Sequence, residues 1–182
     1  NECVSATRNL GISIANGKYI TFVDSDDTIK ENSLNEILNQ VESESLDCLI
    51  TNSVIYKDGL RIKELYKYPK LSSKKPKSGI ELFKKGYSRG SVCGVIFNRI
   101  FLIQNNLNFP VQIKNGEDSF FMSLVFAYAD AIDYLNIDFY RVTLRDDSAS
   151  RTWNYDKVKT MLNNLNVIER YIKNHALNTD QL

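Results

Sequence analysis

The chain has 182 residues, of which 43% are hydrophobic and 11% aromatic, enough for one well-packed domain. The net charge of +1, from 23 basic and 22 acidic residues, argues against nucleic acid as a partner, because nucleic-acid-binding surfaces usually carry a basic excess. One histidine and three cysteines without a C-x-x-C pair argue against a Ser-His-Asp triad, a multi-histidine metal site and a zinc ribbon.

The pattern of apolar residues predicts an α/β domain in which helices and strands alternate. The first predicted helix, over 4–15, has apolar residues four apart on one face: Ala6, Leu10 and Ile14. Before the second helix, Ser33 and Glu36 have the spacing of a capping box.

The remaining elements follow in chain order. They are a strand over 19–23, a helix from 34 to about 44, a buried strand over 46–56, a turn over 57–59, a return strand from 60, a short helix capped by Ser78 and Glu81, a strand over 91–98, a helix over 99–106, a helix that begins near 117, one or two strands over 131–142, and a long amphipathic helix over 158–172.

A cluster of three carboxylates, Asp24, Asp26 and Asp27, directly follows the strand over 19–23. One interpretation is a simple turn or helix cap, since Asp often serves in both. The other is a ligand site, because open α/β sheets bind ligands at the carboxyl ends of their strands. Clustered carboxylates there suit a hard divalent cation, Mn²⁺ or Mg²⁺, which prefers oxygen ligands and often shares them with phosphates.

Two enzyme families have such a string. "FVDSDDTI" resembles the first motif of haloacid-dehalogenase-type phosphatases, in which the first Asp is a nucleophile and Thr28 would bind phosphate. It also resembles the D-x-D motif of family 2 glycosyltransferases. The longer stretch "VSATRNLGISIANGKYITFVDSDD" is similar to that second family almost position for position, with Thr7 in place of the usual Ala.

The resemblance to family 2 glycosyltransferases extends further along the chain. "VCGVIFNRIFLIQNNLNFP", "NGEDSFF" and "FYRVTLRDDSASR" are similar to later segments of the family pattern. It implies a GT-A-like α/β fold, a Rossmann-like mixed sheet flanked by helices. We expect residues 1–152 to be the C-terminal portion of the catalytic domain, lacking its N-terminal nucleotide-binding strands, and residues 153–182 to be a helix packed on it.

The resemblance also implies site residues. Asp24, Asp26 and Arg8 would bind the donor, with Asp26, Asp24 and, less directly, Asp27 holding Mn²⁺ or Mg²⁺. Asp118 of the "E-D" element would be the general base, with Glu117 beside it. A second set would contact phosphate or acceptor: Arg141, Arg145 and Arg151.

The implied reaction moves a sugar, with inversion, from a nucleotide-diphospho-sugar to a saccharide or lipid-linked saccharide acceptor, in the making of a bacterial surface polysaccharide or glycoconjugate. The resemblance places the full-length protein in the cytoplasm or at the inner face of the membrane. Removal of the preceding strands would leave the strand over 19–23 as an open edge that favours self-association. Two alternatives stay open: a Mg²⁺-dependent phosphatase of the haloacid-dehalogenase type, and a non-catalytic glycan-binding or scaffold fragment.

Overall fold

The computed structural model describes residues 4–65, 75–113 and 115–144, which form one mixed sheet with helices on both of its sides. The strand order is β1-β5-β3-β6-β2, and β4 pairs with the far end of β3. Their bounds are β1 (Tyr19–Thr21), β2 (Thr28–Ile29), β3 (Cys48–Lys57), β4 (Leu60–Glu64), β5 (Val95–Asn98) and β6 (Ile132–Thr143).

The centre of the sheet is the long parallel pair β3 and β6, which runs from Cys48 opposite Ile132 to Tyr56 opposite Thr143. The first eight residues of β3 are buried, as expected for a central strand covered on both faces. The other pairings of β3, with β4 and β5, are antiparallel. The predicted turn between β3 and β4 is confirmed, with Asp58 and Gly59 at positive φ, the geometry of a tight hairpin.

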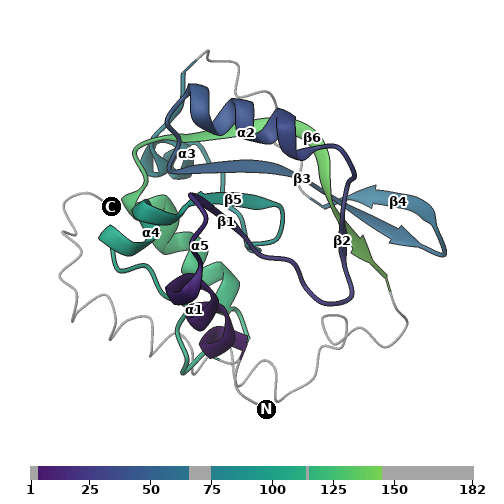
Figure 1. The fold of residues 1–182 in the computed structure, drawn as a ribbon, viewed down its shortest axis with the longest axis horizontal. Coiled ribbons are helices and arrows are strands. Elements are labelled where there is room, and N and C mark those ends of the chain that lie inside the picture. Colours follow the sequence, from purple (N-terminus) through teal and green to yellow (C-terminus); the bar gives the residue numbers. More distant parts are fainter. Residues whose placement is uncertain (1–3, 66–74, 114, 145–182) are drawn as a thin grey trace.

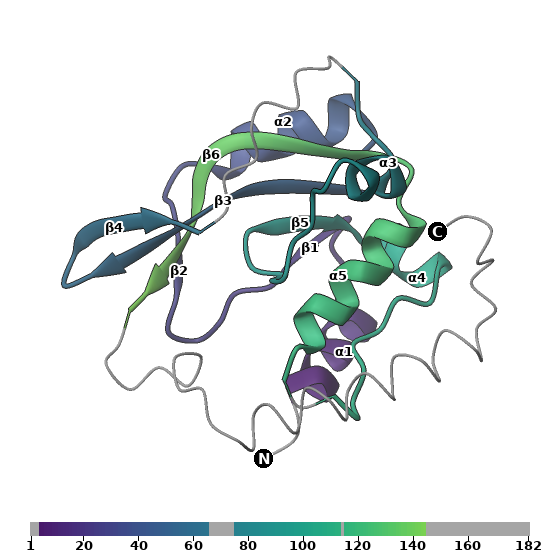
Figure 2. The same ribbon diagram turned by 180° about the vertical axis from the view of Figure 1, so that it is seen from behind.

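The helices lie on two sides of this sheet (Figures 1 and 2). They are α1 (Val4–Ile14), α2 (Leu34–Ser43), α3 (Gly79–Lys84), α4 (Arg99–Gln104) and α5 (Glu117–Tyr128). α2 covers the β3–β6 pair from one side, and α1, α4 and α5 lie on the other, near β1 and β5. Buried residues of α5 surround the helix almost completely, so it forms the centre of the core on its side.

The predicted apolar face of the first helix is wrong. α1 forms, but Leu10 and Ile14 are 57% and 65% exposed, while Ser5 and Ile12 are buried. The helix is turned because two polar side chains on its inner surface, Arg8 and Asn9, have partners inside the protein.

The capping prediction for the second helix is also wrong, whereas that for α3 is confirmed. Ser33 has helical backbone angles and its hydroxyl donates to the Lys30 carbonyl oxygen, so it makes no side-chain cap. Ser78 is extended and its hydroxyl oxygen accepts from the Glu81 amide, at 3.2 Å.

Other predictions fall partly outside the described residues. The helix over 158–172 and the boundary between residues 152 and 153 lie there, so both stay predictions.

Within the described part, β5 is the only strand paired with β1, which places β1 at one end of the sheet, as expected. Self-association through that edge stays a prediction. No described helix combines the length and apolar character needed to cross a membrane.

The contact between α3 and α5 depends on a missing side chain. A Cβ at Gly79 would collide with the backbone of Phe126 in α5. We expect Gly79→Ala to lower the free energy of unfolding by about 2 kcal/mol, because overpacking forces the two helices apart. Gly11→Ala on exposed α1, where no atom lies within 4 Å of a new Cβ, should raise it by up to about 1 kcal/mol. Urea unfolding of both variants measures the difference, and equal stabilities would contradict the packing described here.

Candidate functional site

The acid cluster lies in a tight turn that joins β1 to β2. After β1, Phe22 bridges Cys93, and the chain then turns so that the Asp27 amide donates to the Asp24 carbonyl oxygen at 3.1 Å. The chain next enters β2, which pairs with β6. The cluster therefore lies at the carboxyl end of β1, as the sequence predicts.

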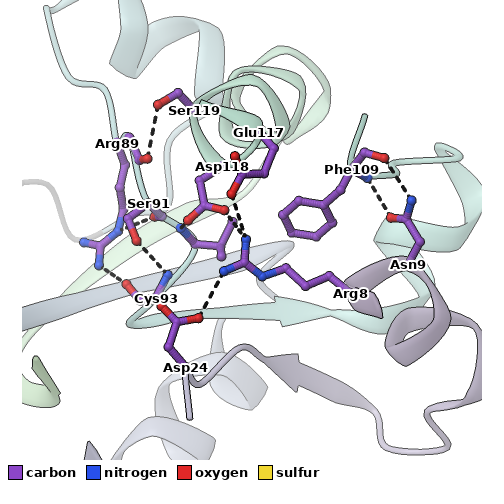
Figure 3. A network of polar contacts seen from close by, with 12 residues as sticks. Arg8, Asn9, Asp24, Arg89, Ser91, Cys93, Phe109, Glu117, Asp118 and Ser119 are labelled. Atoms are coloured by element: carbon purple, nitrogen blue, oxygen red, sulfur yellow. Dashed lines mark hydrogen bonds and ion pairs between the residues drawn. The ribbon is translucent and has the colours of Figure 1, made fainter. Parts of the chain in front are cut away.

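One guanidinium connects this turn to the predicted general base (Figure 3). Arg8 contacts Asp24 at 3.1 Å, Glu117 at 3.6 Å and, more closely, Asp118. The Arg8 side chain is 12% exposed, against 47% for Asp24. Burial alone would lower the pKa of Arg8, but Asp118 and Asp24 raise it, so the residue is a permanent cation. The structure thus brings together four predicted site residues from three distant segments.

Arg8 is held in place by its helix and by an aromatic stack. The neighbouring Asn9 bonds the Phe109 backbone twice, donating to the carbonyl oxygen at 2.8 Å and accepting from the amide at 2.7 Å. The guanidinium carbon of Arg8 lies 5.3 Å from the centre of the Phe109 ring, within range of a cation–π contact. That ring stacks on Phe121 of α5, with centroids 4.0 Å apart.

Asp118 lies in the first turn of α5, where the helix dipole favours a carboxylate. One oxygen accepts from Arg8 and the other from the Val92 amide at 3.4 Å. Burial raises the pKa of Asp118 above its usual range, although Arg8 and the Val92 amide oppose that rise. Burial and the charge of Asp118 likewise raise the pKa of Glu117.

The loop under Asp118 is organised by a buried arginine. Arg89 is 3% exposed and donates to the backbone oxygens of Thr51, Ser91 and Cys93. Gly94, at φ +75°, leaves the room that this guanidinium needs. The loop touches both halves of the site, since Val92 bonds Asp118 and the Cys93 thiol donates to Asp24 at 3.5 Å.

The three acid-cluster residues have different environments. Asp26 is exposed and makes no hydrogen bond or ion pair with any described residue. Asp24 is half-exposed and bonded to Arg8. Asp27 accepts bonds from Tyr140 and Thr143 with its two oxygens. Asp24 and Asp26 are therefore the more exposed of the three carboxylates, although both oxygens of Asp24 also accept from protein donors, Arg8 and Cys93.

The carboxylates of Asp24 and Asp26 fit a divalent cation whose remaining ligands come from a bound phosphate and water. Within the described residues, no three His, Cys, Asp or Glu side chains are grouped as a metal centre. Mg²⁺ is commonly bound through one or two carboxylates, with phosphates and water completing the shell. Asp26 and Asp24 match that use, so the metal role predicted for them stays a proposal.

The predicted arginine group does not join this network. Arg141 follows Tyr140 on β6, and neighbouring strand residues face opposite sides, so its guanidinium lies over the Tyr56 ring, 5.4 Å from the centroid. Arg145 and Arg151 lie outside the described residues.

Sequence reasoning missed four contributors to the site: Arg89, the Val92 amide, Cys93 and Tyr140. Tyr140 lies in "FYR", a segment already matched to the family pattern, so its aromatic hydroxyl was an available signal. The backbone amide of Val92 has no signal in sequence.

The first 104 residues, more than half of the chain, match the family model described as glycosyl transferase family 2. The chain belongs to glycosyl transferase family 2. The resemblance stated from its motifs is therefore confirmed, and the phosphatase alternative is set aside.

Curated relatives and solved structures agree with this membership. The chain is 25% identical to glycosyltransferase GlyA of Streptococcus pneumoniae over 84% of its own length and 23% of the relative's. It is 25% identical to the succinoglycan biosynthesis protein ExoO of Rhizobium meliloti, covering 97% of this chain and 51% of ExoO. The structure of residues 1–349 of S. aureus TarS in complex with UDP-GlcNAc is similar, with a TM-score of 0.66 at 21% identity, covering 88% of this chain and 45% of that TarS chain.

The likeness to TarS confirms the predicted GT-A fold class. The chain spans about a sixth to a half of the length of the relatives and structures that it matches. Because the chain covers only part of these proteins, the activity of the whole protein is proposed below.

Removing Arg8 tests the electrostatics of the site. Arg8→Met should lower the free energy of unfolding at neutral pH by about 2 kcal/mol, less than for a fully buried pair because Asp24 is half-exposed. The folded-state pKa values of Asp118 and Glu117 are already raised, and without Arg8 they rise further. Stability is lost as pH rises through a raised carboxyl pKa, so the penalty should be larger at neutral pH and should shrink as pH falls and the two carboxyls take up protons.

Arg61→Met is the matched control, since Arg61 also contacts two carboxylates, Glu64 and Asp138, but on the exposed β3–β4 hairpin. It should change stability little at any pH. Chemical unfolding of both variants from pH 4 to pH 8 gives the comparison. A penalty for Arg8→Met that is equal at both ends of this range would contradict the assigned ion pairs.

Proposed function

We propose that the protein containing this chain transfers a sugar from a nucleotide-diphospho-sugar to an acceptor hydroxyl, with inversion at the anomeric carbon. The observation that carries the proposal is the Arg8 bridge between Asp24, on the donor side, and Asp118, on the acceptor side. It holds a candidate donor-binding carboxylate and a candidate base in one site. Family membership makes sugar transfer the chemistry that such a pair would serve.

The donor side is the exposed pair Asp24 and Asp26. TarS, which shares the fold, has been solved with UDP and with UDP-GlcNAc, which supports a nucleotide-sugar donor here. Around Arg8 the described side chains are mainly acidic, so a doubly charged diphosphate needs an added cation to approach. Mn²⁺ or Mg²⁺ held by Asp26 and Asp24 would stabilise the charge of the departing diphosphate. These residues would orient the metal and the donor.

The acceptor side is Asp118. A sugar hydroxyl is a poor nucleophile until a carboxylate takes its proton. Burial favours proton uptake by raising the pKa of Asp118, while Arg8 opposes that rise and fixes the orientation of the carboxylate. Attack by the deprotonated oxygen from the face opposite the diphosphate accounts for inversion.

We further propose that the product is a bacterial surface polysaccharide or glycoconjugate, made at the cytoplasmic side of the membrane on a saccharide or lipid-linked saccharide. The name of ExoO, a succinoglycan biosynthesis protein, supports this setting. Assaying the full-length protein against a panel of nucleotide-sugars and acceptors identifies the sugar, the acceptor and the linkage.

Asp118→Asn in the full-length protein tests the catalytic proposal. The amide keeps the shape of the side chain but cannot accept the proton, so transfer should fall about 100-fold or more, while nucleotide binding with Mn²⁺ persists. Asp130→Asn, an exposed residue just past the other end of α5, is the matched control and should keep full activity. Donor turnover by mass spectrometry measures both.

Two results would reject parts of this proposal. Wild-type transfer by Asp118→Asn would exclude Asp118 as the base and leave Glu117 as the next candidate. Nucleotide binding by the wild type with no transfer to any acceptor would favour a non-catalytic binding protein.

A further inference from the structure

Asp27 is tied to β6 by both of its carboxylate oxygens. The Tyr140 hydroxyl donates to one oxygen at 2.8 Å, and the Thr143 amide donates to the other, also at 2.8 Å. Thr143 is the last residue of β6, and Tyr140 lies three residues before it. A single carboxylate thus holds the acidic turn against the end of the longest strand.

Tyr140 ties the same turn at a second point. Its hydroxyl, which donates to Asp27, also accepts from the Asp24 amide at 3.0 Å. The side chain is fully buried, and burial raises the pKa of its hydroxyl, so the group stays protonated and keeps its donor role. Both ends of the 24–27 turn therefore meet on one phenol oxygen.

These bonds set where the other carboxylates point. The turn is closed by the bond from the Asp27 amide to the Asp24 carbonyl oxygen and anchored at both ends by Tyr140. The side chain of Asp24 is left to meet Arg8, and that of Asp26 is left exposed. The difference between the neighbours Asp26 and Asp27 is plain: one is free of protein partners among the described residues, and the other has a protein donor on each oxygen.

We propose that Asp27 and Tyr140 form a clamp that positions Asp24 and Asp26 for the donor, and that Asp27 is a positioning residue and not a metal ligand. This inference rests on the proposed function, because it takes Asp24 and Asp26 as the donor-side groups. It differs from the sequence interpretation, which counted Asp27 as a supporting or alternative metal ligand beside Asp24 and Asp26.

The clamp and ligand roles predict opposite results for one conservative change. Asn at position 27 can accept from the Thr143 amide with its oxygen and donate to the Tyr140 oxygen with its nitrogen, so it preserves both ties to β6 but reverses the direction of the Tyr140 bond. The Tyr140 proton, which Asp27 accepts in the wild type, then turns to the neighbouring Cys93 sulfur. It removes the negative charge that a metal ligand needs. Ala at position 27 removes both functions.

Calorimetric titration of the full-length protein with nucleoside diphosphates (UDP, GDP, CDP, ADP and dTDP) plus Mn²⁺ separates the two roles. For the diphosphate that binds the wild type, Asp27→Asn should stay within about threefold of the wild-type Kd. Asp27→Ala and Tyr140→Phe should each weaken binding about tenfold, the loss expected for a hydrogen bond. Asp26→Asn, which removes a proposed ligand, should abolish the Mn²⁺-dependent part of binding.

Tyr134→Phe is the matched control. It removes a hydroxyl from the same strand, but one that bonds Asn52 and Asn136, away from the acidic turn. Its nucleotide affinity should equal that of the wild type, which shows that loss of a β6 hydroxyl does not by itself weaken binding.

Amide hydrogen exchange, measured by NMR, tests the clamp without any ligand. Tyr140→Phe should speed exchange at the Asp24 amide, and Asp27→Ala should speed it at Thr143, whereas Asp27→Asn should leave both near wild type. A wild type that binds none of the nucleotides would overturn the proposed function, and the exchange rates would still decide whether the clamp exists.

Two outcomes would overturn the inference. One is an Asp27→Asn variant that loses Mn²⁺-dependent binding as fully as Asp26→Asn, which would make Asp27 a ligand. The other is a Tyr140→Phe variant with wild-type affinity and wild-type exchange at Asp24.

Discussion

The site depends on one guanidinium placed among carboxylates that would otherwise repel one another. Arg8 contacts Asp24, Glu117 and Asp118, which come from segments about a hundred residues apart in the chain. Carboxylates this close together in space raise each other's pKa and repel one another. The cation reverses that effect, so the acidic turn after β1 and the start of α5 can share one site.

Contacts from several elements hold the Arg8 guanidinium in place. Asn9 fixes α1 to the Phe109 backbone, and the Phe109 ring lies beside the Arg8 guanidinium while stacking on Phe121. From the opposite side, the loop organised by Arg89 supplies the Val92 amide to Asp118. In this chain the adjacent Arg8 and Asn9 have separate roles: Arg8 carries the charge, and Asn9 sets the position of the helix that bears it.

Apart from the two-residue β2, the order of elements was predictable because it follows from local patterns. The tight turn at Asp58-Gly59 and the cap at Ser78 depend on neighbouring residues alone, and both were found. The face of α1 was not predictable from periodicity, because Arg8 and Asn9 meet partners distant in sequence. The same holds for Asp27, whose bonds to β6 could not be seen in a string of three similar carboxylates. Family resemblance named the candidate residues Arg8, Asp24, Glu117 and Asp118, whereas their partners became visible only in the tertiary contacts.

The most direct test of this account is the titration of the Asp118 carboxyl carbon by NMR in the wild type, Arg8→Met and Asp24→Asn. Arg8 lowers and Asp24 raises the pKa of Asp118, so the two substitutions should shift it in opposite directions. Arg8→Met should raise it, and Asp24→Asn should lower it, because a negative charge is removed and Arg8 is left more fully to Asp118. An Asp118 pKa that is the same in all three proteins would show that the donor and base carboxylates do not share one site.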